Sequence, residues 1–368
     1  MTAASNPPIF DGHNDTLLSL YKPERGAGRT FFERSEKGHI DLPRARAGGL
    51  GGGFCAVFVP SERAPLPADP DKAAQAALAA FSGDRPLPPT PELGYAQQAA
   101  IAMTASLFRI EAESDGEVKV VRTADELATC LRDGVFAALL HFEGAEAIDT
   151  DFDALEVFYR AGLRSLGPVW SRPNAFAHGV PFRFPASPDT GPGLTDAGRA
   201  LVRACNRLGI MLDLSHMNEQ GFWDVAGLTD APLVATHSNA HAICEVTRNL
   251  TDKQLAAIKE SDGMVGLNFA CGFLNEEGKN DPATPIATMV KHIDYLVEHL
   301  GIDRVGFGSD FDGATVPQEI GDAAGLPKLV AALRAAGYDD ASLSKLAHEN
   351  WVRVLTKTWK DSGLRTQD

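Results

Sequence analysis

Short apolar runs alternate with longer segments of helical spacing along most of this 368-residue chain. Seven of the runs have the length and largely apolar character of buried strands, and the polar segment 10–15 is interpreted as the end of an eighth strand. Most of these strands are separated by segments whose apolar residues recur every three or four positions. Such alternation predicts a parallel sheet covered by helices on both faces. We expect the strands within residues 10–15, 48–60, 135–143, 162–170, 209–216, 232–237, 263–269 and 304–310.

Eight strand and helix units in one chain predict closure into a (β/α)8 TIM-type barrel, organised as a single domain with insertions on its rim. An open doubly wound sheet is the alternative, but the Gly-x-Gly-x-x-Gly turn expected after its first strand is missing. The Ala- and Pro-rich residues 61–91 are expected to form one excursion on the rim. The glycines of 48–53 indicate a place where backbones approach closely.

Helices are predicted from the same pattern and from capping signals. Thr195 and Thr251 are expected to cap the starts of two helices, the second through a capping box with Gln254. Helical spacing of apolar residues predicts further helices at 95–113, 153–160, 285–299 and about 339–360.

Composition narrows the possible functions. The chain is 44% hydrophobic, and its net charge of −15 is spread along the sequence rather than gathered in blocks. Nucleic acids and anionic membranes bind basic patches, so neither is expected as a partner. The five cysteines are scattered without a Cys-x-x-Cys pair, which indicates reduced thiols rather than disulfides or a cysteine-based zinc site. With no signal peptide and no apolar run of about 20 residues, a cytoplasmic location is expected.

Candidate metal ligands gather at the carboxyl ends of the predicted strands, where a barrel places its catalytic residues. Residues two apart in a strand point to the same side, so His13 and Asp15 should converge on one point. Other strands end in a histidine or an acid: Glu143, His216, His237 and Asp310. Three imidazoles and up to three carboxylates exceed the needs of one tetrahedral metal. They suit two metals that share a bridging carboxylate and a bridging hydroxide.

Each of these residues also has an ordinary structural explanation. A single histidine at a strand end is usually a hydrogen-bonded structural or surface group, Glu143 could cap the next helix, and Asp310 could anchor its turn. Independent structural roles would not place all of them at one end of a barrel. His141 lies on the same side of its strand as Glu143 and is expected in the core or in support of the site.

Six segments that contain or adjoin the candidate ligands form a recognisable set. They are Asp11-Gly12-His13-Asn14-Asp15, Phe142-Glu143-Gly144, Leu212-Asp213-Leu214-Ser215-His216, Thr236-His237-Ser238-Asn239-Ala240, Thr247-Arg248-Asn249-Leu250 and Gly306-Phe307-Gly308-Ser309-Asp310-Phe311-Asp312-Gly313. In these segments, in order and over nearly the whole length, the chain resembles the membrane (renal) dipeptidases, which are zinc peptidases of the amidohydrolase superfamily. The resemblance implies a binuclear zinc barrel that hydrolyses dipeptides, including those with a D-residue at the C-terminal position, and that forms a homodimer.

The resemblance also implies a role for each matching residue. Arg248 would bind the free carboxylate of the substrate through a bidentate, charge-assisted pair. Asp310 would accept the proton of the attacking water and deliver it to the leaving amine. Two zinc ions per subunit would be bridged by Glu143 and a hydroxide, and the other ligands would be His13 and Asp15 on one ion and His216 and His237 on the other.

The chain departs from the mammalian members of that family in two respects. They carry a histidine after the fourth strand that contacts substrate, whereas this chain has Trp170. Trp170 itself, Arg172 and His178 are the candidates to bind substrate in its place. The mammalian secretion signal and lipid-anchor tail are also missing, so no membrane partner is expected.

Other functions fit the sequence less well than the dipeptidase prediction. Lactonases and phosphotriesterases of the superfamily typically bridge their metals with a carboxylated lysine, and no lysine lies within 135–143 or 162–170. Deaminases of the superfamily usually begin with His-x-His, where this chain has His13-Asn14-Asp15. A catalytically silent barrel should have lost ligands or the proton-accepting acid, yet every matching position is filled. The sequence therefore favours a zinc-dependent dipeptidase with a small dipeptide as its substrate.

Overall fold

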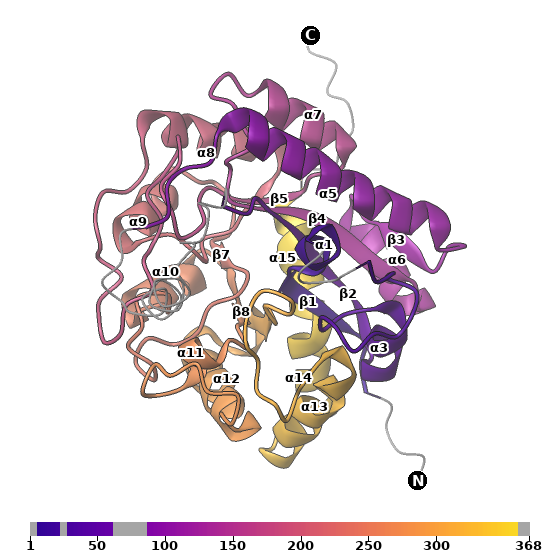
Figure 1. Cartoon of the computed structure of the whole chain (residues 1–368). Helices are drawn as coiled ribbons and strands as arrows, with labels where there is room; N and C mark the ends of the chain where they lie inside the picture. The colour runs from indigo at the N-terminus through magenta and orange to yellow at the C-terminus, as the bar shows by residue number, and fades with distance from the viewer. Residues whose placement is uncertain (1–5, 23–27, 62–86, 360–368) are drawn as a thin grey trace, which may run out of the picture.

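Parallel strands curl into a barrel, and helices surround it on the outside (Figure 1). The structure, a computed structural model, describes residues 6–22, 28–61 and 87–359. The predicted rim excursion at 61–91 lies outside the described residues except at its two ends. The predicted C-terminal helical segment at 339–360 is helical through Thr358.

All eight predicted strands are present, which confirms the predicted (β/α)8 barrel. They are β1 (Ile9–Asn14), β2 (Leu50–Phe58), β4 (Phe136–Glu143), β5 (Ser165–Gly167), β6 (Met211–Leu212), β7 (Val234–Ala235), β8 (Met264–Leu267) and β9 (Val305–Phe307). The described chain has one more strand, β3 (Val118–Val120), which pairs with the start of β4. The sequence pattern does not predict β3, because three residues are too few to show a period.

Two neighbouring strand pairs, β6 with β7 and β9 with β1, close the barrel with little backbone pairing, and we call these two junctions the seams. Strand pairing gives one sheet in the order β1-β2-β4-β5-β6 and a second in the order β7-β8-β9. A single parallel bridge between Asp213 and Val234 joins β6 to β7, and another between Asn14 and Phe311 joins the end of β9 to β1. Backbone pairing is therefore weakest at these two seams, and other contacts must hold the sheets together there.

A buried aspartate bonds across each seam. Asp11 accepts hydrogen bonds from the backbone N–H and the hydroxyl of Ser309, at 2.6 and 2.7 Å. Asp213 accepts them from the backbone N–H and the hydroxyl of Thr236, at 2.9 and 2.6 Å. These charge-assisted hydrogen bonds connect the strand ends where the backbone ladder does not.

The helices follow the predicted pattern. Thr195 and Thr251 accept hydrogen bonds from the starts of their helices as expected, and Thr251 forms the predicted capping box with Gln254. The long helices are α5 (Leu93–Glu113), α6 (Ala124–Asp133), α7 (Asp153–Ala161), α8 (Asp196–Leu208), α9 (Glu219–Ala226), α10 (Asp252–Glu260), α12 (Ile286–Leu300), α13 (Leu326–Ala335) and α15 (Asn350–Thr358). Shorter ones are α1 (Thr16–Tyr21), α3 (Leu42–Gly48), α11 (Cys271–Leu274) and α14 (Asp340–Ser344).

An aromatic column fills the barrel interior and leads to its carboxyl-terminal end. The indole of Trp351, from α15, packs against Phe54 of β2 with ring centroids 5.0 Å apart. Phe54 contacts His141 at 6.0 Å, and His141 contacts His13 at 5.5 Å. The indole N–H of Trp351 donates to the carbonyl of Phe307. The position of His13 therefore depends, through His141 and Phe54, on how Trp351 of α15 packs in the core.

None of the helices in the described part of the chain combines the length and the apolar character needed to span a bilayer.

Gly52 lies at a close approach of β2 to β4, as the run of glycines predicts. A Cβ at this position would lie 2.2 Å from the carbonyl oxygen of Ala137. We expect Gly52→Ala to lower the free energy of unfolding by at least about 2 kcal/mol, because the backbones must separate to accept the methyl group. Urea unfolding followed by circular dichroism measures the change.

Gly94 provides the matched control, because it lies in α5 and has open space where a methyl group would be placed. Gly94→Ala should leave the protein as stable as wild type or raise its stability by up to about 1 kcal/mol. Equal effects of the two substitutions would contradict the close strand approach.

Candidate metal centre

The predicted ligands meet at one end of the barrel, each delivered by the end of a strand. His13 lies in β1 and Asp15 follows it, Glu143 ends β4, and His216, His237 and Asp310 follow β6, β7 and β9. His13 and His237 are fully buried, Asp15, Glu143 and His216 are nearly so, and Asp310 is partly exposed. Parallel strands bring their carboxyl ends to one mouth, so local strand geometry explains the gathering.

Three imidazoles turn the same nitrogen toward one oxygen. The Nε2 atoms of His216, His237 and His13 lie 2.9, 3.4 and 3.6 Å from Glu143 Oε1. The Nε2 of His13 is also 3.6 Å from Asp15 Oδ2. Glu143 Oε1 is therefore the common neighbour of the three imidazoles, and the rings of His13 and His237 stack with their centroids 3.8 Å apart.

The donors fit divalent cations. Two groups have ligand atoms within 4.8 Å of one another, namely His13, Asp15 and Glu143, and Glu143, His216 and His237. Both ring nitrogens of His13 and the Oδ1 of Asp15 are buried without a hydrogen-bond partner among the described residues. Leaving such a group unpaired typically costs about 1–3 kcal/mol, and a bound cation removes the deficit for atoms that coordinate it. Mixed imidazole and carboxylate donors suit zinc.

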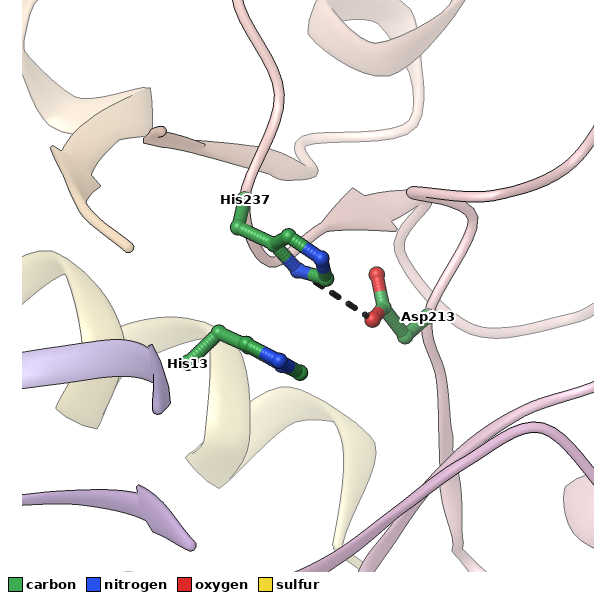
Figure 2. Close-up of side chains that lie close together, drawn as sticks. All are labelled: His13, Asp213 and His237. Atoms are coloured by element: carbon green, nitrogen blue, oxygen red, sulfur yellow. Dashed lines mark ion pairs between the residues drawn. The ribbon is translucent and has the colours of Figure 1, made fainter. Parts of the chain in front are cut away.

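A third group joins His13 and His237 to Asp213, a residue to which the sequence pattern assigned no role (Figure 2). Asp213 Oδ2 lies 3.9 Å from His237 Nδ1 and 3.6 Å from His141 Nε2. The carboxylate already accepts hydrogen bonds from Ser215 and Thr236. Asp213 is therefore better suited to hold the imidazoles than to bind a cation. The sequence did contain a sign of this role, because Asp213 is an acid within an otherwise apolar predicted strand, three residues before His216.

Burial and mutual charge shift the protonation of the cluster. Burial alone would lower the pKa of His13, but the charges of Glu143, Asp15 and Asp310 outweigh it and raise the pKa to about 10. Burial raises the pKa of Glu143 well above its usual value. The pKa values of His216 and His237 are held well below normal, chiefly by burial. Without a cation, His13 therefore keeps its proton at neutral pH, and Glu143 holds a proton more tightly than an exposed carboxyl group does.

Asp310 lies in a left-handed turn beside the cluster. Its φ is 58°, and Asp312 in the same turn has a φ of 67°, values that cost energy outside glycine. Asn268 Nδ2 donates to Asp310 Oδ2 at 2.9 Å. A Cβ on Gly313 would lie 2.1 Å from Asp15 Oδ2 and 2.3 Å from Asp310 Oδ1, so glycine lets the turn approach both carboxylates. Although part of the Asp310 side chain is exposed, loss of water around its carboxylate is the main cause that raises its pKa to about 6.

A cavity of about 810 Å³ opens onto the cluster. Asp15, Glu143, His216 and Asp310 line its polar part. Aromatic side chains line the walls, and the predicted substrate contact Trp170 is one of them, with its ring centroid 5.9 Å from that of His216. A volume of this size and a mixed polar and aromatic lining are typical of small-molecule sites.

Arg172 and His178, the other two predicted substrate contacts, are not among the residues that line this cavity. Arg172 is fully buried and bonds to Glu146 at 2.8 Å and to the carbonyl of Val59 at 2.6 Å. His178 is only partly buried in the loop after β5. Arg172 was a candidate because it lies two residues after Trp170, and its position in the sequence did not reveal its ion pair with the buried Glu146.

Arg248 is buried next to the cluster. Its guanidinium donates to Ser238 Oγ at 2.8 Å and to the carbonyl of His237 at 3.0 Å, whereas Nε has no hydrogen-bond partner among the described residues. The guanidinium carbon lies 5.7 Å from the ring centroid of Phe273, a wall residue of the cavity. Burial lowers the pKa of Arg248 to about 10, so the group remains charged at neutral pH.

The sequence matches the model of the membrane dipeptidase family, peptidase family M19, over residues 3–363. A metallopeptidase from Rhodobacter sphaeroides, solved with a phosphinate mimic of the dipeptide L-Ala-D-Ala, is 54% identical with a TM-score of 0.89, and the match covers 96% of this chain and 100% of that one. The dipeptidase AC of family M19 is 53% identical with a TM-score of 0.89, over 96% and 99% of the two chains. The dipeptidase tcpJ of Claviceps purpurea is 27% identical over 348 residues, which are 94% of this chain and 76% of that protein.

Cation binding to the metal-free protein should release protons and should tighten as the pH rises from 6 toward 9. His13 carries a proton at neutral pH and must lose it to become a ligand, and Glu143 binds protons more tightly than an ordinary carboxyl group. Calorimetric titration with Zn²⁺ in buffers of different ionisation heats counts the protons released. Glu143→Gln should bind more weakly and release fewer protons, while Glu156→Gln, on the exposed face of α7, should match wild type. An affinity independent of pH would contradict the protonation scheme.

Proposed function

This chain belongs to the membrane dipeptidase family, peptidase family M19, and on that premise we propose that it hydrolyses the peptide bond of dipeptides with two zinc ions. The single observation that carries the proposal is the convergence of three imidazole Nε2 atoms on Glu143 at the floor of a small cavity. This arrangement provides donors for two cations and leaves one side open to a substrate.

Glu143 is proposed to bridge the two ions. His13 and Asp15 would complete one site, and His216 and His237 the other. This division follows the two donor groups that share Glu143. When bound, the ions would acidify a water molecule and polarise the carbonyl of the substrate.

Asp310 is proposed to move the proton. Its carboxylate lines the cavity beside Asp15, and Asn268 fixes one of its oxygens. A pKa raised toward neutrality suits a group that must both accept and give up a proton. Asp310 would take the proton of the attacking water and deliver it to the amine as the peptide bond breaks, which returns the carboxylate to its starting state.

Arg248 is proposed to bind the free carboxylate of the substrate. Its charge is retained in a buried position behind the cavity wall, and its Nε is an unused donor among the described residues. A fixed cation behind the cavity wall and the metal centre at the cavity floor would admit a single C-terminal residue, which selects dipeptides over longer peptides.

The walls of the cavity would set the side-chain preference. Trp170 is proposed to contact the substrate together with Phe58, Phe182 and Phe273, so apolar side chains should be favoured. The relative from Rhodobacter sphaeroides holds a mimic of L-Ala-D-Ala. By analogy, dipeptides with a D-residue at the C-terminal position are proposed substrates here as well.

Asp310→Asn should lower kcat for dipeptides by roughly 10²- to 10⁴-fold, because an amide can neither accept nor return the proton. Amino-acid release is measured with zinc-loaded protein on L-L and L-D dipeptides and on tripeptides. The variant should keep its zinc, and Asp151→Asn on the exposed surface should keep full activity. If metal-loaded wild type cleaves no peptide, the dipeptidase proposal is wrong, and lactones, phosphoesters or a noncatalytic ligand are the next candidates.

Arg248→Lys should lower kcat/KM for dipeptides by roughly 10- to 100-fold, because lysine cannot make the bidentate contact with a carboxylate. Wild type should strongly prefer a dipeptide over the same dipeptide with an amidated C-terminus, and the variant should lose most of that preference. Matching thermal melts of the two proteins establish that the variant is folded. A preference that survives the substitution would assign carboxylate recognition to another residue.

A further inference from the structure

Thr236 connects a carboxylate to one of the candidate ligands at the seam between β6 and β7. The Oγ1 of Thr236 lies 2.6 Å from Asp213 Oδ2 and 2.7 Å from His237 Nδ1. All three side chains are buried, with at most 3% of their surface exposed. Figure 2 shows the carboxylate of Asp213 and the ring of His237 facing each other across this seam.

The hydroxyl has one hydrogen for two short contacts. Asp213 is saturated as an acceptor, because its Oδ1 also receives the backbone N–H and the hydroxyl of Ser215 and the backbone N–H of Thr236. A carboxylate with this many donors is ionised, so the hydrogen of Thr236 goes to Asp213 Oδ2. Thr236 Oγ1 then accepts from His237, and Nδ1 must be the protonated nitrogen.

We propose that Asp213, acting through the hydroxyl of Thr236, is a positioning residue that fixes His237 as the Nδ1–H tautomer. Nε2 is then left without a proton, and this is the nitrogen that faces His216 and Glu143. The consequence for metal binding rests on the proposed function, whereas the tautomer itself does not. A carboxylate that orients a ligating histidine through its other nitrogen is an established way to tune a metal site.

The backbone strengthens the same arrangement. Ser215 Oγ, which donates to Asp213, accepts the backbone N–H of His237 at 3.0 Å. Asp213 therefore anchors both the main chain and the ring of His237 from across the seam. The other two imidazoles are held differently. His216 Nδ1 contacts Ser171 Oγ at 2.8 Å, and His13 Nδ1 has no hydrogen-bond partner among the described residues.

The experiment compares Thr236→Val, which removes the hydroxyl at nearly constant volume, with Thr236→Ser, which keeps it. Metal-free protein labelled with ¹⁵N-histidine is examined at about pH 8, where an imidazole of ordinary pKa is neutral. Long-range ¹H–¹⁵N correlations identify the protonated nitrogen of each ring. We expect His237 to carry its proton on Nδ1 in wild type and in Thr236→Ser, and to lose this preference in Thr236→Val.

Zinc affinity is measured on the same proteins by competition with a chelating dye. Thr236→Val should weaken the binding of one ion by roughly 10- to 100-fold, and Thr236→Ser should restore most of it. Thr104→Val is the matched control, because the hydroxyl of Thr104 is buried in α5 without a partner among the described residues. It should leave zinc binding unchanged.

Two results would overturn the proposed hydrogen-bond relay from Asp213 through Thr236 to His237. One is a proton on Nε2 of His237 in the metal-free wild type, and the other is unchanged zinc affinity in a folded Thr236→Val. Because the tautomer is read without metal or substrate, its outcome is separate from that of the dipeptidase assay. A wild type with the Nδ1–H tautomer and no peptidase activity would support the relay and contradict the proposed function.

Discussion

Closure of the barrel at two seams is the constraint on which the candidate site depends. The backbone ladder narrows there to a single bridge on each side, and buried aspartates supply the missing contacts. Asp11 takes hydrogen bonds from Ser309, and Asp213 takes them from Thr236. These residues are near neighbours in sequence of the candidate ligands, and Ser309 directly precedes Asp310. The interactions that close the barrel therefore also set the geometry of the site.

Burial gives the cluster its affinity for cations. His13, Asp15 and Glu143 are removed from water, which penalises their charged forms unless opposite charge is close. The raised pKa values of His13 and Glu143 mean that both groups hold protons more tightly here than in water. Zinc would replace those protons and satisfy donor atoms that otherwise lack partners. The buried donors lower the stability of the metal-free chain, and a bound cation would recover that free energy.

The sequence predicted what depends on local periodicity. Strand and helix units, the barrel and the gathering of the candidate ligands at the strand ends follow from spacing that neighbouring residues determine. Contacts between residues far apart in the sequence, which form only when their strands meet, could not be predicted from this local spacing. Thr236 and Asp213 follow different strands and meet only where β6 lies beside β7. Arg172 pairs with Glu146, which lies in the loop after another strand, so no local pattern indicated this ion pair. A strand as short as β3 likewise owes its existence to pairing with β4 rather than to its own pattern.

The most direct test of the account is a crystal structure of the zinc-loaded protein with a phosphinate dipeptide analogue, with data collected on both sides of the zinc absorption edge. The account predicts two anomalous peaks per chain, one beside His13 and Asp15 and one beside His216 and His237, with Glu143 between them and the analogue over both. A single peak, or two peaks without Glu143 between them, would contradict it.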